Sequence, residues 1–184
     1  MGSSIVISKL SSFRLETQRL AIRPVLKTDL DSIYLIHKEP IVNRFVPYQT
    51  WLSFTDAEDW YARVKRRRKD TAEQFVIIRK DDDTLLGTCI VFVHPSDFES
   101  FELGYVLAKQ HWANGYMHEA LNEFVPAIAK KLKLNHLFAV IQTENTPSLK
   151  LIAKLGFRES HRKQDDDKEM IYLLRRFDSP MPNL

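Results

Sequence analysis

The sequence predicts a single α+β domain over residues 10–178, and three observations support this fold class. Strand-like runs separated by short turns occupy residues 75–107. Longer segments with helical spacing of apolar residues lie before and after these runs. Neither an internal repeat nor a linker interrupts the chain, and 184 residues are enough to bury one hydrophobic core. Residues 1–9 and 179–184 are expected to be loose termini.

The N-terminal third is expected to contain one strand and two helices. Residues 20–23 alternate apolar and polar side chains before Pro24, as a short strand does. One helix is expected to begin at Thr28-Asp29 and a second one near Thr55 or Asp56, because these residue types cap helices. The chain between these helices contains Pro40 and Pro47 and is expected to be irregular.

The rest of the chain is expected to contain six strands and two helices. The runs 75–78, 85–93 and 98–107 form an antiparallel meander. A long helix follows over about 115–132, and Pro126 is expected to kink it. The domain then ends with the strand 136–141, a helix from Thr146-Pro147 to Gly156, and the strands 157–163 and 169–177.

Composition and charge exclude several classes of protein. The net charge is +3, but six of the seven residues 63–69 are basic, and the balance without this run is −3. The positive charge is thus one local patch, whereas nucleic-acid-binding proteins spread it over a broader face. The single cysteine, Cys89, excludes an internal disulfide and a cysteine-rich zinc site, and we expect it to be a small buried strand residue. The histidines lack metal-ligand spacing, so no metal is expected. The N-terminus has no apolar signal core, which favours a cytoplasmic protein with no membrane partner.

The loop before the long helix is the first candidate for a binding site. A helix N-terminus presents unpaired N–H groups and a partial positive charge, so it binds phosphate wherever the backbone can approach closely. Gly115 and the small Ala113 permit that approach. Many strand–loop–helix connections contain one glycine, however, and the glycine-rich P-loop and dinucleotide motifs are absent.

Three motifs resemble those of the GNAT N-acetyltransferases, and together they span residues 13–177. Gln110-x-x-Ala113-x-Gly115 is similar to the family's acetyl-CoA motif, Arg/Gln-x-x-Gly-x-Gly/Ala, with alanine in place of the first glycine. Asn145-x-x-Ser148 and the run 154–157 resemble the second motif. Residues 15–24 resemble the opening of the ribosomal-protein N-terminal acetyltransferases, the RimJ/RimL-like branch.

The resemblance implies a fold, a reaction and a set of binding residues. The fold would be a mixed, mostly antiparallel sheet of six to seven strands flanked by about four helices. The reaction would be direct attack of a primary amine on acetyl-CoA in a ternary complex, without a metal. A ribosomal protein as partner and a homodimer are both compatible with it. The acetyl-CoA site would comprise Tyr105, Val106, Leu107, Gln110, Trp112, Ala113, Asn114, Gly115, Tyr116, Met117, Asn145, Ser148 and Lys154, with Lys150 as a second candidate for the adenosine phosphate.

The expected catalytic residues are Glu102, Ser148 and Asn145. Many family members place a tyrosine proton donor where this chain has Ile152, so the resemblance transfers that role to Ser148 and assigns Asn145 to the pantetheine arm. The alternative is that Asn145 and Ser148 only cap a helix. Glu102 is the candidate base because strand alternation places it opposite the apolar face, beside Ser100 and Gly104. Glu119 and Glu144 are weaker candidates.

The acceptor amine is left open between a protein N-terminus, a polyamine, an amine-bearing antibiotic and another small amine. An α-amino group with a pKa near ~8 is neutral far more often at pH 7 than a lysine near ~10.4, so it asks less of a base. Early aromatic residues could line an acceptor cleft or pack in the core: Phe45, Tyr48, Trp51, Trp60 and Tyr61. The alternative function is a non-catalytic acyl-CoA fold that binds nucleic acid or an acidic partner through residues 63–69.

Overall fold

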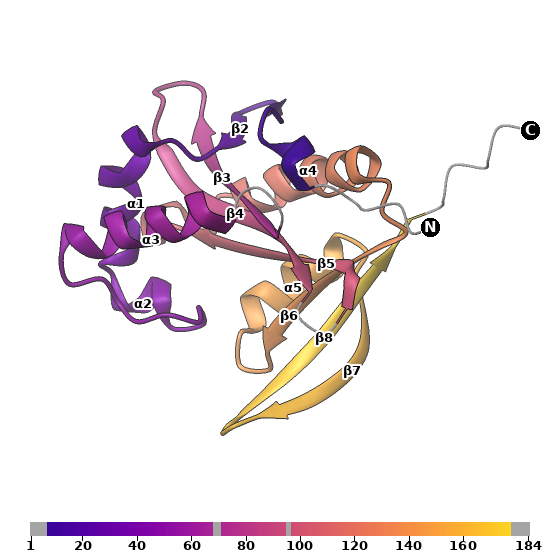
Figure 1. Cartoon of the computed structure of the whole chain (residues 1–184). Coiled ribbons are helices and arrows are strands. Elements are labelled where there is room, and N and C mark those ends of the chain that lie inside the picture. The colour runs from indigo at the N-terminus through magenta and orange to yellow at the C-terminus, as the bar shows by residue number, and fades with distance from the viewer. Residues whose placement is uncertain (1–6, 68–70, 95–96, 178–184) are drawn as a thin grey trace, which may run out of the picture.

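The computed structural model describes residues 7–67, 71–94 and 97–177, and these form an eight-stranded sheet of order β1-β2-β3-β4-β5-β6-β8-β7 (Figure 1). Neighbouring strands are antiparallel except for β5 and β6, which are parallel. The expected meander is confirmed as β3–β4–β5. The strands are β1 Leu15–Glu16, β2 Leu20–Pro24, β3 Ala72–Arg79, β4 Leu85–His94, β5 Asp97–Leu107, β6 His136–Gln142, β7 Arg158–Asp165 and β8 Lys168–Arg176.

Helices cover both faces of the sheet, and each face has its own apolar cluster. Helices α4 and α5 pack on one face, where their apolar side chains join those of β2 to β6 and β8. Helices α1 and α3 pack on the other face around Val25, Val76 and Trp60 (Figure 1). The α-helices are α1 Leu30–His37, α2 Pro40–Asn43, α3 Phe54–Arg67, α4 Tyr116–Leu132 and α5 Thr146–Lys154, and short 3-10 helices span Ile7–Leu10, Lys27–Asp29 and Lys109–His111.

Helix α4 fixes the position of the loop that precedes it by burying a continuous apolar stripe. Phe124 packs edge-on against Phe75 of β3, with 5.0 Å between ring centroids, and Phe13 packs against both rings. Full burial of a side chain of this size stabilises the folded state by about 1.5–3 kcal/mol. Pro126 lies on the exposed side of α4, and the helix continues through it to Leu132. Proline has no backbone N–H, so the carbonyl four residues before Pro126 has no helical hydrogen-bond donor. This carbonyl lies on the solvent side of the helix.

The described chain differs from the sequence-based expectation at its beginning and in its strand count. Ile7 and Leu10 are fully buried in the core, although residues 1–9 were expected to be loose. The sheet has eight strands and not six or seven, because the two-residue strand β1 pairs with β2. Residues 40–43 form the short helix α2, with Pro40 in its first turn. None of these segments is long enough to show a hydrophobic period, and tertiary contacts determine them.

Candidate active site

A cleft of about 790 Å³ opens on the α3 face of the sheet, where β5 and β6 separate. The two strands are in register at Glu102 and Phe138. From this pair toward the C-terminal ends of the two strands, residues 102–106 of β5 and 140–142 of β6 line the cleft. The divergence of two parallel neighbours leaves a gap within the sheet, and a ligand can reach the strand backbones there.

Glu102 lies in the wall of the cleft, on the face that alternation predicts. The register places Ala72, Phe92 and Glu102 side by side on β3, β4 and β5, and all three line the cleft. Gly104 lines it as well, whereas Phe101, which does not line the cleft, is buried in the core on the opposite face. Burial raises the pKa of Glu102 to about 7. Near neutral pH this carboxyl group can therefore both accept and release a proton.

The N-terminus of α5 reaches the other wall of the cleft. Asn145 caps this helix, because its side-chain oxygen accepts the backbone N–H of Ser148 at 3.3 Å. The Ser148 carbonyl in turn lies 3.4 Å from the hydroxyl of Tyr105, which donates to it from β5. Burial is the main reason that the pKa of Tyr105 rises to about 12, so this hydroxyl keeps its proton at neutral pH. Two hydroxyl-bearing residues thus line the cleft, Tyr105 from β5 and Ser148 from α5.

The loop before α4 has the backbone geometry of an anion cradle. Both Ala113, with φ of 60°, and Gly115, with φ of 75°, adopt the left-handed conformation. The first backbone hydrogen bond of α4 runs from Glu119 N–H to the Gly115 carbonyl, so the N–H groups of residues 116–118 precede it. The unexpected feature is Ala113, because a non-glycine residue is uncommon in this conformation.

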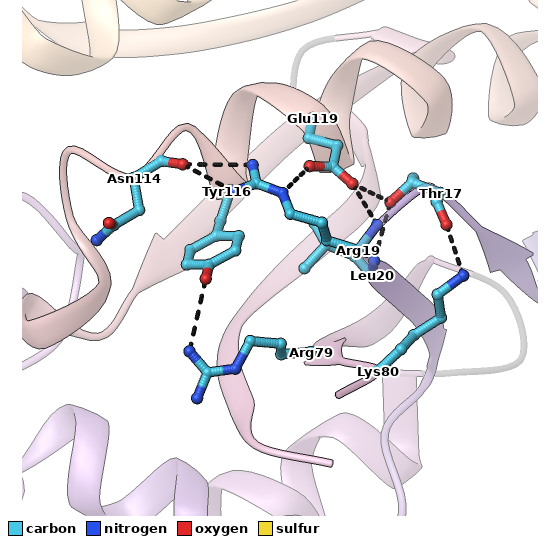
Figure 2. Close-up of polar contacts among 8 residues, drawn as sticks. All are labelled: Thr17, Arg19, Leu20, Arg79, Lys80, Asn114, Tyr116 and Glu119. Carbon is cyan, nitrogen blue, oxygen red and sulfur yellow. Dashed lines mark hydrogen bonds and ion pairs between the residues drawn. The ribbon is translucent and has the colours of Figure 1, made fainter. Parts of the chain in front are cut away.

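An ion-paired network anchors this loop to the N-terminal segment (Figure 2). The guanidinium of Arg19 donates to Glu119 at 2.6 Å and to the Asn114 carbonyl at 3.3 Å, and it stacks 4.4 Å above the ring of Tyr116. Glu119 also accepts the hydroxyl of Thr17 at 2.6 Å. We call Thr17, Arg19 and Glu119 the N-terminal clamp. Lys80 supports it by donating to the Thr17 carbonyl at 2.7 Å.

The structure separates the predicted site residues into two groups. Glu102, Tyr105, Val106, Asn145 and Ser148 line the cleft. The second group lies at or beyond the end of β5 or on α5 and does not line it: Leu107, Gln110, Trp112, Ala113, Asn114, Gly115, Tyr116, Met117, Lys150 and Lys154. The side chain of Met117 is buried in the core, so this residue has only its backbone to offer a ligand.

Four further residues singled out in the sequence have defined surroundings in the structure. Burial disfavours the charged form of Glu119, but hydrogen bonds from Thr17 and Arg19 outweigh this effect and lower its pKa, so Glu119 is engaged as part of the clamp. Glu144 is exposed and pairs with Arg44 at 3.3 Å. The fully buried Ile152 points into the core, so a tyrosine would not fit at that position. Cys89 is buried in β4, as expected.

The end of the cleft next to α3 is aromatic and basic. Phe45, Tyr48 and Trp60 line it, together with Arg63 and Arg67. The loop that carries Phe45 and Tyr48 is held by the buried His37, whose Nδ1 lies 2.7 Å from the side-chain oxygen of Asn43. Tyr48 donates to the other ring nitrogen at 3.3 Å. Trp51, in contrast, packs in the core with Trp60.

Sequence reasoning missed three contributors to the site. The clamp residue Arg19 acts across 100 positions, and no local pattern indicates such a contact. Tyr105 was expected as part of the coenzyme site, but not as a hydroxyl beside α5. The third contributor is the pair Arg63 and Arg67 at the α3 end of the cleft. Their helical spacing with Trp60 could have identified this pair, because residues three and four apart share a helix face.

Comparison of the chain with known families identifies the class of protein that has this anion cradle, this gap between parallel strands and this buried carboxylate. The family model described as "Acetyltransferase (GNAT) domain" matches residues 19–158, and the chain belongs to this family. It is a GNAT N-acetyltransferase, a transferase that depends on acetyl-CoA.

Individual proteins support the same assignment. The chain is 32% identical over 142 residues to the uncharacterized N-acetyltransferase YnaD of Bacillus subtilis, covering 77% of this chain and 81% of that one. It is 28% identical over 155 residues to the uncharacterized N-acetyltransferase p20 of Bacillus licheniformis, covering 84% and 87%. The fold is similar to that of RimL, a ribosomal L7/L12 alpha-N-protein acetyltransferase solved with coenzyme A, with a TM-score of 0.81, 10% identity and coverage of 91% and 100%.

Two kinds of feature are absent from the described ranges. No helix among these residues combines the length and the apolar character that crossing a bilayer requires. Nor do they contain a group of three or more His, Cys, Asp or Glu residues arranged to hold a metal ion.

Proposed function

We propose that this protein transfers the acetyl group of acetyl-CoA to the α-amino group of a peptide or protein, with Glu102 as the general base. The observation that carries the proposal is the position of Glu102. Its carboxyl group lines the cleft where β5 and β6 separate, and its pKa of about 7 suits proton transfer at neutral pH.

The residues around α4 fit the phosphates of coenzyme A. The N–H groups that precede the first bond of α4 supply donors, and the helix dipole favours negative charge there. Arg19 holds this loop in place through the Asn114 carbonyl and the ring of Tyr116, while its own charge is paired with Glu119 at 2.6 Å. Lys150 and Lys154 are exposed on α5 and are candidates for the adenosine phosphate.

The residues of the cleft can perform both proton transfers of the reaction. The acceptor amine must be neutral to attack the thioester, and Glu102, directly or through a water molecule, takes the proton that the amine loses. The departing thiolate is stabilised by a hydroxyl donor. Ser148 and Tyr105 are the two candidates, because both line the cleft at the N-terminus of α5.

The charge of the cleft favours an α-amino group over a polyamine. Among the described lining residues Glu102 is the one acid, and Arg63 and Arg67 would repel a second ammonium group. The ordinary pKa of an α-amino group, near ~8, also leaves a larger neutral fraction at pH 7 than that of lysine.

Thiol release from acetyl-CoA over a panel of amines tests the proposal. The panel should contain peptides with free N-termini, the same peptides with blocked N-termini and a free lysine, and spermidine. We expect release with the first set alone, and mass spectrometry should locate the acetyl group on the N-terminus. Release with spermidine or lysine alone would contradict the proposed acceptor.

A further inference from the structure

The geometry points to an anion-binding site formed by Arg63 and Arg67, which selects peptide N-termini that carry an acidic side chain at the second or third residue. This inference rests on the proposed function and specifies its substrate class. It concerns the α3 end of the cleft, where Phe45, Tyr48 and Trp60 were expected as possible acceptor-cleft residues but Arg63 and Arg67 were not connected with acceptor choice.

One stripe of α3 faces the cleft, and both arginines belong to it. Trp60, Arg63, Val64 and Arg67 have the three- and four-residue spacing of a single helix face, and all four line the cleft. Lys65 and Arg66 of the same basic run are exposed and do not line it. Arg68 and Lys69 lie outside the described residues. The run is therefore divided: two of its cations face the cleft, and two face away from it.

No ion pair with another described residue accounts for the two arginines. Asp56, two turns before Arg63 on α3, forms no ion pair with it and accepts the backbone N–H groups of Ser53 and Leu52, both at 2.8 Å. These bonds, and to a lesser extent the charge of Arg63, lower the pKa of Asp56. Arginine at a partly enclosed, aromatic-lined surface is well suited to bind a carboxylate, because its planar donor groups match two carboxylate oxygens.

No ion pair among the described residues joins either arginine to Glu102, because the arginines line the cleft from α3 and Glu102 lines it from β5. An opposite charge within about 4–6 Å lowers the pKa of a carboxyl group by about 1–3 units. The pKa of Glu102 is raised, and burial is the cause. The acid and the two cations thus occupy separate parts of one cleft.

This separation specifies the ligand. An amine placed at Glu102 and an anion placed at the arginines belong to different parts of one ligand, because the first lies against β5 and the second against α3. The carboxylate of a free amino acid is joined to its amine through a single carbon and is too close. An extended peptide advances about 3.3 Å per residue, so an acidic side chain one or two residues after the N-terminus reaches the arginines. Phe45, Tyr48 and Trp60 would pack against the peptide between the two ends.

Matched peptides and matched variants test the inference. The peptides should begin Ser-Asp-Glu or Ser-Asn-Gln and be identical thereafter. The variants are R63Q/R67Q and, as a control on the same helix with the same loss of charge, K65Q/R66Q. The first measurement is kcat/KM for each peptide from thiol release at physiological ionic strength. The second is calorimetric binding of the N-acetylated products to the CoA-loaded protein, which does not require turnover.

We expect the wild type and K65Q/R66Q to prefer the acidic peptide by about tenfold in both measurements, and R63Q/R67Q to use and bind the two peptides equally. Equal use of both peptides by the wild type would overturn the inference, as would a preference that survives in R63Q/R67Q. Loss of the preference in the control as well would show a diffuse charge effect and would overturn it too. If no peptide is acetylated, the proposed acceptor class fails, and the binding measurement alone still decides whether the arginines select an anion.

Discussion

Replacing Glu102 by glutamine is the most informative single perturbation, because it removes the carboxylate while keeping the size of the side chain. A positioned general base contributes about 10²- to 10⁴-fold to the rate. We therefore expect Glu102→Gln to lower kcat with a peptide acceptor at least about a hundredfold at pH 8. The KM for acetyl-CoA should change little, because the cradle before α4 is separate from the cleft wall that carries Glu102.

The pH dependence of the wild type should show the titration of the same group. With a pKa of about 7, Glu102 is protonated and inactive as a base in mild acid, so kcat/KM should rise through about pH 7. The acceptor amine adds its own titration near ~8. In Glu102→Gln the rise in kcat/KM near pH 7 should disappear, and the rise near ~8 that is due to the acceptor amine should remain.

Stability supplies an independent measurement with a definite sign. The pKa of Glu102 rises on folding from 4.5 to about 7, so the folded state binds this proton more tightly than the unfolded state does. Its stabilising contribution is complete below about pH 4.5 and is lost as the pH rises through about 7. At 1.36 kcal/mol per unit the cost of the charged form at pH 8.5 is at most about 3 kcal/mol.

Urea denaturation of both proteins at several pH values tests this reasoning. Glu102→Gln should gain stability relative to the wild type at pH 8.5, and the difference should shrink toward pH 4.5. Unchanged turnover in a variant with this stability gain would show that Glu102 is buried but is not the base. An unchanged stability difference across this range would refute the raised pKa itself.

The remaining predictions concern the cradle and the proton donor. Ala113→Gly should raise the free energy of unfolding by up to about 1 kcal/mol in urea denaturation, because φ of 60° strains alanine; a loss of stability would contradict this. Gly115→Val should weaken acetyl-CoA binding about tenfold or more in a calorimetric titration, since φ of 75° suits no branched side chain, and unchanged affinity would refute the cradle. Ser148→Ala should lower turnover at least about tenfold with KM for acetyl-CoA nearly constant, if Ser148 is the donor. If Tyr105→Phe has that effect instead, the phenol is the donor; no effect in either variant would exclude both hydroxyls.

Local patterns were sufficient to predict most of the fold. The meander, the helix α4 and the orientation of Glu102 follow from periods of two and 3.6 residues, which the sequence displays directly. The loop at Gly115 was recognisable through its resemblance to the GNAT acetyl-CoA motif, because one glycine in a strand–loop–helix connection is common. Asn145 was interpreted both as a cap and as a ligand, and the structure shows the cap at 3.3 Å.

The features that escaped prediction depend on contacts between distant segments. The separation of β5 and β6 follows from how two strands meet in space, not from the residues of either strand alone. Whether a basic run forms a solvated helix end or lines a cleft depends on the direction of α3, and the sequence does not specify that direction. Burial of Ile7 and Leu10 likewise requires the surface formed by β3 and α4.

The N-terminal clamp has a consequence for the order in which the protein assembles during synthesis. Arg19 leaves the ribosome long before its partner Glu119, which is 100 positions later. Until then its guanidinium has no carboxylate to bind, and the loop before α4 does not yet exist. Once α4 has emerged, β1 to β5 and the loop are all present, whereas β6 to β8 and α5 are still to come. The clamp can therefore anchor the loop while the acceptor end of the cleft, with Arg63, Arg67 and Glu102, is already present and α5 with Ser148 has not yet been made.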